Sequence, residues 1–132
     1  ERPVSYTDFS YAGGYEAARD LVARGATAIM CGSDVMAAGA LEAVRAMGLA
    51  IPGDVSVVGF DDLFLSAAFQ PPLTTVSQPR ADIGRQAMTI LLSRLSGAAV
   101  PDEPVVIATQ LKVRGTTAPP KSLTTQHQGR HQ

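Results

Sequence analysis

Several residue classes are scarce in this chain, and each scarcity excludes a class of protein. The 132 residues include one cysteine and no tryptophan, and aromatic residues make up 5% of the sequence. A single cysteine excludes an internal disulfide framework and favours a reducing compartment. No apolar run approaches the roughly 20 residues that cross a bilayer, so no membrane-spanning segment and no membrane partner is predicted.

Charge of either sign is also low. The chain holds 11 Lys and Arg against 12 Asp and Glu, which leaves a net charge of −1. It therefore lacks the basic surface that binds the phosphates of DNA or an anionic membrane. Hydrophobic residues make up 45% of the sequence, which is the composition of a globular domain. If the parent protein binds DNA, this segment does not hold the phosphates.

Three helices are predicted where apolar residues recur at helical spacing. The first covers residues 12–24, and the second runs to Met47 from Ser33-Asp34, a pair that offers an N-cap. Of this pair, Asp34 is predicted to be the capping residue. A third helix, from Arg80 to Leu95, carries a broad apolar face, more than the predicted strands need.

Short apolar runs between these helices predict buried strands. The clearest is Val55–Phe60, which is rich in Val and follows Pro52-Gly53. Strands alternating with helices imply βαβ units, so the predicted fold class is α/β, a parallel sheet with flanking helices. Three buried strands are few for a sheet covered on both faces, and we expect the chain to be part of a larger protein. The other extended pieces are predicted at 27–31, 73–76, 105–107 and 111–113.

Asp61 and Asp62 directly follow the clearest strand. In open α/β sheets, ligands bind just beyond the carboxyl ends of the strands, so these two carboxylates are placed to meet one. Asp62 is also suited to cap a short helix predicted over residues 63–69. A Mg²⁺ or Ca²⁺ site on the pair is a further alternative, and it needs additional ligands. Asp34 is the one other candidate ligand at a strand end.

Six short motifs in this sequence resemble the C-terminal half of LacI/GalR-type repressors. The resemblance covers roughly residues 7 to 118, and it rests on several linked motifs, which are more specific than any one of them. The motifs are Asp8-Phe9-Ser10, Ser33-Asp34-Val35-Met36-Ala37, Ser56–Asp62, Pro71–Val76, Gln78-Pro79 and Val113-Arg114-Gly115-Thr116-Thr117.

The resemblance implies a periplasmic-binding-protein-like fold of type I, in which two α/β subdomains joined by three crossover strands hold a ligand between them. In that scheme, residues 1–78 belong to the C-terminal subdomain and 79–108 to the N-terminal subdomain. Residues 109–118 then return to the C-terminal subdomain. Residues 119–132 are rich in Gln and Thr, and from that composition we predict a disordered tail. The DNA-binding helix-turn-helix would lie upstream of this chain.

The resemblance also implies ligand contacts. Asp61 would accept hydrogen bonds from the effector, and Phe9 would pack its ring on the flat face of a sugar or purine. Gln78 would contact the ligand from a crossover strand. Ser33 stands where many relatives carry Asn, and its shorter reach weakens the case for direct contact. The alternatives are a cap for Asp61, a core position for Phe9 and a hinge residue bonding only backbone for Gln78.

A dimer interface is implied around the second helix and the residues after Asp62. Its candidates are Val35, Ala38, Phe64, Leu65 and Phe69, and they could instead pack within the monomer.

The polar tail holds His127 and His131 without other ligands at metal-binding spacing, so no metal and no cofactor is predicted. Cys31 has no nearby His to activate it and is expected to be an inert buried thiol.

Taken together, these features predict the effector-binding part of a LacI-family transcriptional regulator, cytoplasmic and homodimeric, and not an enzyme. Its ligand would be a sugar or purine-like small molecule, and closure of the subdomains would control DNA binding. A sugar-binding protein of a transport system would use the same fold. A Mg²⁺-dependent flavodoxin-like enzyme using Asp61 and Asp62 is the third alternative.

Overall fold

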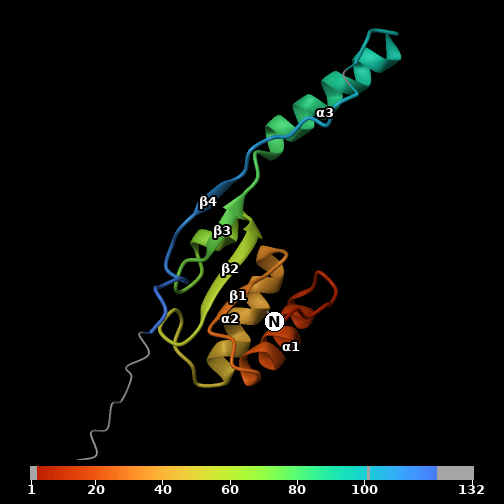
Figure 1. Ribbon diagram of the computed structural model, residues 1–132. Coiled ribbons are helices and arrows are strands. Elements are labelled where there is room, and N and C mark those ends of the chain that lie inside the picture. Colours follow the sequence, from red (N-terminus) through yellow and green to blue (C-terminus); the bar gives the residue numbers. More distant parts are fainter. Residues whose placement is uncertain (1–2, 101, 122–132) are drawn as a thin grey trace, which may run out of the picture.

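The structure, a computed structural model, describes residues 3–100 and 102–121. Its elements are α1 (Tyr11–Ala23), β1 (Ala28–Met30), α2 (Asp34–Ala46), β2 (Ser56–Asp61), the 3-10 helix η1 (Phe64–Ala67), β3 (Thr74–Ser77), α3 (Arg80–Leu95) and β4 (Gln110–Lys112). The four strands form one sheet in the order β1-β2-β3-β4, with α2 packed on the sheet and α1 packed on α2 (Figure 1). Helix α3 projects away from the sheet at the end of β3 (Figure 1).

The sheet is mixed. Strands β1, β2 and β3 are parallel, as predicted, whereas β4 pairs antiparallel with β3. The strand predicted at residues 111–113 is therefore confirmed one residue earlier, at Gln110–Lys112. Residues 105–107 pair with no strand of the described chain, so the extended piece predicted there is not part of the sheet. The ladder stops because β3 itself ends at Ser77, opposite Gln110.

The ends of α1 and α2 follow from local side chains. Ser33 caps α2, because its hydroxyl oxygen accepts a hydrogen bond from the Met36 N–H at 3.2 Å. The prediction that Asp34 is the cap is therefore wrong: Asp34 is the first helical residue, and its buried side chain has other partners. Gly25 and Gly48, at φ of 89° and 73°, follow the last turns in the left-handed conformation that glycine adopts without strain.

Two glycines let α1 and α2 cross with their backbones in contact. A Cβ added at Gly39 would lie 2.0 Å from the Tyr11 carbonyl oxygen, and one at Gly14 would lie 2.2 Å from the Met36 carbonyl oxygen. No larger side chain fits this crossing unless the helices separate. The crossing closes a core built mostly from small and β-branched residues: Ala18, Ile29, Cys31, Ala37, Ala40, Leu41, Ala43, Val44, Val55, Val57 and Leu73.

The returning segment enters the sheet between β2 and β3. Pairing of β2 with β3 begins at Val58 and Thr74. Just before these residues, Thr116 lies between the two strands and makes the hydrogen bonds that direct pairing would otherwise make. The Val57 N–H donates to the Thr116 carbonyl at 2.9 Å, and the Thr116 hydroxyl donates to the Val57 carbonyl at 2.6 Å. The same hydroxyl oxygen accepts from the Thr74 N–H at 2.9 Å, so one buried threonine joins both strands.

Helix α3 confirms the prediction for residues 80–95, and none of its residues is buried. Its apolar face, from Ile83 to Leu95, lacks cover within the described residues, and Leu95 is 75% exposed. No helix among the described residues is long and apolar enough to cross a membrane.

The polar segment that begins at residue 119 is described only in part. Residues 119–121 form neither helix nor strand, and Lys121 pairs with Asp54 at 2.5 Å. Residues 122–132, to which the prediction of a disordered tail also applied, lie outside the described residues. So do His127 and His131.

Candidate functional site

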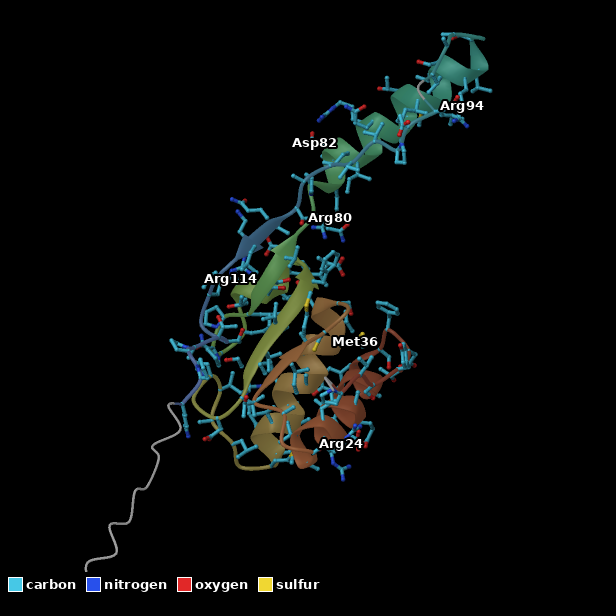
Figure 2. All side chains as sticks on the ribbon, in the orientation of Figure 1. Arg24, Met36, Arg80, Asp82, Arg94 and Arg114 are labelled. Carbon is cyan, nitrogen blue, oxygen red and sulfur yellow. The ribbon has the colours of Figure 1, made fainter. Side chains whose placement is uncertain are left out.

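Asp61 stands at the carboxyl end of β2, as predicted, and two residues of the segment that follows β3 hold it. The Gln78 side-chain amide donates to Oδ1 of Asp61 at 2.8 Å. The Arg80 guanidinium donates to the Asp61 backbone carbonyl at 3.0 Å. This is possible because Asp61 lies opposite Ser77 in the parallel ladder, which brings the next residues of the chain alongside it. Figure 2 shows Arg80 at the junction between the sheet and α3.

The backbone at this point has an unusual conformation. Asp61 and Asp62 have φ values of 111° and 53°, and they are the two non-glycine residues with positive φ in the described chain. Such a conformation costs on the order of 1–3 kcal/mol at a residue with a side chain, and it persists where surrounding contacts over-determine it. Here those contacts include Gln78 and Arg80. No hydrogen bond reaches Oδ2 of Asp61 from the described residues, so this oxygen is open to a ligand hydroxyl.

Asp62 points to a different partner. Its Oδ1 accepts from the Arg114 guanidinium at 2.7 Å, and both side chains are largely covered. Arg114 also donates to the Leu73 carbonyl at 2.9 Å, which ties the returning segment to the loop between β2 and β3 (Figure 2). The position that precedes η1 is Leu63, with no side-chain cap. The prediction that Asp62 caps this helix is therefore wrong, and residues 63–69 form only a short 3-10 turn at Phe64–Ala67.

The Arg114 hydrogen bond holds the pKa of Asp62 below its usual range. Because the folded-state pKa lies below the unfolded value of about 3.9, the pair stabilises the fold above that pH. This contribution is lost as pH falls through the folded-state pKa. We expect Asp62→Asn to lower the free energy of unfolding by about 1 kcal/mol at pH 7, the value for a partly screened, charge-assisted bond.

The difference between Asp62→Asn and the parent chain should shrink progressively as the pH falls below the unfolded-state value of about 3.9, as measured by urea unfolding between pH 7 and about 2. Asp20→Asn is the matched control, because the Asp20 side chain is 56% exposed in its pair with Arg24. The control should change stability little at any pH. A difference for Asp62→Asn that stays constant from pH 7 to 2 would contradict the ion-pair account.

Phe9 and Ser33 are the other predicted ligand residues. Among the described residues, neither forms a hydrogen bond with Asp61, Gln78 or Arg80. Phe9 is 73% exposed, so the alternative of a core position is wrong. Its ring lies against Gly32, where an added Cβ would be 3.1 Å from the Phe9 Cε1 atom. Ser33 is buried and uses its hydroxyl as the helix cap. The Gln78 side chain donates to the Asp61 side chain, which excludes the alternative that Gln78 is a hinge residue bonding only backbone.

The predicted interface residues divide by exposure. Phe64 is 87% exposed, Leu65 50% and Val35 42%, so these three present apolar surface to solvent. Ala38 is half-buried. Phe69 is half-buried and packs against the hydrophobic core, which favours for this residue the alternative of packing within the monomer.

The third carboxylate considered for a metal site and the Cys31 thiol both have structural roles. Asp34, the third carboxylate considered for a metal site, is 2% exposed and bonds to Leu63, Ser66 and Thr75 instead of turning to Asp61. No group of three or more His, Cys, Asp or Glu side chains lies at metal-binding spacing within residues 3–100 and 102–121. Burial raises the pKa of the Cys31 thiol to about 12, as expected for an inert thiol.

Sequence reasoning missed the roles of Arg80, Arg114 and Asp34. Arg80 follows Gln78 by two residues at the start of a predicted helix, and that position next to a crossover was a usable signal. Arg114 lies in a quoted motif, but nothing in the sequence pairs it with Asp62, 52 residues away. Asp34 satisfies the sequence rule for a helix cap, and only its burial shows another role.

Comparison with known proteins finds a matching domain family and several similar proteins. Residues 1–117 match the periplasmic binding protein-like domain family. The chain is 45% identical over 115 residues to the HTH-type transcriptional regulator MalR of Streptomyces coelicolor, which is 87% of this chain and 33% of MalR. Two solved structures are also similar. A complex of the transcriptional regulator CelR with cellobiose has 38% identity and a TM-score of 0.80, covering 86% of this chain and 35% of CelR. A lac repressor dimer bound to operator and the anti-inducer ONPF has 34% identity and a TM-score of 0.77, covering 83% and 39%.

The chain thus spans about a third of the length of the curated relatives it matches. The mixed α/β sheet agrees with the fold of these regulators. The resemblance to LacI-type repressors, first seen in the motifs around Asp61, is confirmed by these relatives. This chain belongs to the periplasmic binding protein-like domain family, in the form found in LacI-type transcriptional regulators.

Proposed function

We propose that this chain is part of the small-molecule sensor of a LacI-type transcriptional regulator and that Asp61 binds the effector. The observation that carries this proposal is the Asp61 carboxylate, held at the carboxyl end of β2 in a positive-φ backbone by Gln78 and Arg80. A carboxylate with one open oxygen suits the hydroxyl of a sugar or the N–H edge of a purine. Cellobiose, bound in the CelR complex, is a ligand of this kind.

Closure around the effector would pass through the two segments that leave the sheet. One runs from β3 into α3 and carries Gln78 and Arg80, and the other returns as β4. Effector bound to Asp61 would favour one arrangement of α3 relative to the sheet. Because Arg80 belongs to α3 and bonds to Asp61, the effector site and the moving helix share a contact.

The assignment of segments is part of this proposal. Residues 1–78 and 109–118 form the C-terminal subdomain, and 79–108 belong to the N-terminal subdomain, whose remaining parts would cover the exposed face of α3. Val35, Ala38, Phe64 and Leu65 lie in a homodimer interface, and Phe69 packs against the core. DNA is bound through an upstream helix-turn-helix, the protein acts in the cytoplasm, and it is a regulator without enzymatic activity or cofactor.

A melting-shift screen of the full-length regulator tests the proposal. The probes are cellobiose, maltose, ribose and hypoxanthine, which cover disaccharide, monosaccharide and purine chemistry. A ligand at 100 times its dissociation constant stabilises the native state by about 2.7 kcal/mol. The Asp61→Ala variant should bind the active probe at least about 10-fold more weakly, because each hydrogen bond to a charged acceptor contributes about 1.5–3 kcal/mol.

The matched control is Asp54→Ala. Asp54 precedes β2 at the opposite end of the strand, where it pairs with Lys121, so its loss should leave affinity unchanged. Equal affinity in Asp61→Ala and the unmodified protein would overturn the site. Stabilisation by Mg²⁺ alone, abolished by Asp61→Ala, would instead favour metal chemistry.

A further inference from the structure

Asp34 is a buried carboxylate that the proposed ligand contacts do not use. It is the first residue of α2, and it is 2% exposed. A buried carboxylate is costly unless hydrogen-bond donors surround it. The identity of those donors therefore indicates what the residue is for.

Three donors converge on Asp34, and they come from two different segments. Oδ2 accepts from the Leu63 N–H at 2.8 Å and from the Ser66 hydroxyl at 2.5 Å. Oδ1 accepts from the Thr75 hydroxyl at 2.5 Å. Gly59 leaves room for the carboxylate, because a Cβ there would lie 2.2 Å from Oδ1.

All three donors lie between Asp61 and Gln78 in the sequence, two of them near Asp61 and one near Gln78. Leu63 and Ser66 belong to the loop that follows Asp61, and Thr75 belongs to β3, three residues before Gln78. Asp34 therefore ties the loop after the ligand carboxylate to β3, the strand that leads into Gln78. The positive φ at Asp61 and Asp62 makes this loop one that relaxes unless its surroundings hold it.

We infer that Asp34 is the positioning residue of the effector site: it holds the loop at 61–66 against β3 and so aims the Asp61 carboxylate. The inference rests on the proposed function, in which Asp61 is the ligand-binding carboxylate. A purely structural Asp34 would support the core in general, and its loss would loosen the whole sheet without acting through Asp61.

Amide hydrogen exchange in the full-length regulator tests the positioning directly and needs no ligand. Asp34→Asn keeps the size of the side chain but turns an N–H₂ group toward donors. The amides of residues 62–66 should exchange at least about 10-fold faster, while those of 56–60 in β2 keep their protection. If Asp34→Asn does not fold, Ser66→Ala removes one of the three bonds and should produce the same local pattern at smaller size. Acceleration spread evenly over β1, β2 and β3, or none at all, would overturn the inference. Asp20→Asn, on the exposed side of α1, should leave exchange in 62–66 unchanged.

A double-mutant cycle then tests whether Asp34 acts through Asp61, using the probe among cellobiose, maltose, ribose and hypoxanthine that stabilises the protein most. Asp34→Asn alone should weaken binding about 10-fold, and it should weaken it no further when Asp61→Ala is already present. Additive losses would assign Asp34 a structural role. If Asp61→Ala alone leaves affinity unchanged, the proposed site fails, whereas the exchange pattern still decides whether Asp34 holds the loop.

Discussion

Gly39→Ala is expected to destabilise the 132-residue chain by about 3 kcal/mol, although alanine is the better helix former. The added methyl group would lie 2.0 Å from the Tyr11 carbonyl oxygen and 2.8 Å from the Tyr15 nitrogen. Both neighbours are backbone atoms of α1, so no side chain can rotate away and the two helices must separate. Overpacking of a core typically costs 1–3 kcal/mol, and a rigid neighbour puts this site at the upper end. Urea unfolding followed by circular dichroism measures the change.

Gly84→Ala is the matched control for this prediction. Gly84 also lies inside a helix, α3, but nothing stands within 4 Å of the position that its Cβ would take. Alanine there gains up to about 1 kcal/mol of helix propensity without a clash. We therefore expect opposite outcomes from the same chemical change. If both variants unfolded at the same urea concentration, the close crossing of α1 and α2 would be wrong.

Thr116→Val should cost a similar amount, about 3 kcal/mol, although valine has nearly the same shape as threonine. The lost hydroxyl bridges two buried backbone groups, the Val57 carbonyl and the Thr74 N–H. When the hydroxyl is removed, the Val57 carbonyl and the Thr74 N–H are both left without a hydrogen bond. Each unsatisfied buried group costs about 1–3 kcal/mol. The measurement is again the free energy of unfolding in urea.

Thr116→Ser separates the hydroxyl from the methyl group in this test. Serine keeps both hydrogen bonds and loses one methyl group from a fully buried position, which costs about 1 kcal/mol. Thr116→Val should therefore be clearly less stable than Thr116→Ser. The reverse order would mean that apolar packing, and not the bridge between β2 and β3, makes this residue important. Because β2 ends in Asp61 and β3 leads directly into Gln78, a loosened bridge should also weaken effector binding.

Most of the regular structure was predictable because local patterns specify it. The periodic apolar residues of α1, α2 and α3 place each helix within one or two residues of its observed bounds. The apolar run ending at Phe60 predicts β2, and the rule that ligands bind beyond strand ends draws attention to Asp61. These inferences succeed because each depends on neighbours within a few residues along the chain.

The two wrong cap predictions share one cause, which is that the partner of each carboxylate lies far away in the sequence. Asp62 and Asp34 both lie at the start of a segment predicted to be helical and satisfy the local rule for an N-cap. Asp62 instead meets Arg114, and Asp34 meets Thr75, 41 residues away. Charged and buried partners of this kind stabilise a carboxylate more than a single exposed backbone N–H does, so tertiary contacts override the local preference.

The sequence by itself determined the three α-helices, the parallel strands β1, β2 and β3, and the carboxylate that ends β2. Residue periodicity and turn residues suffice for this, because they act over short distances. Only the tertiary structure decided what each carboxylate does. Asp61 is held by Gln78 and Arg80, Asp62 joins the returning segment, and Asp34 fastens the loop between β2 and β3. The physical reason is that a carboxylate takes its role from the donors around it, and folding brings those donors from distant parts of the chain.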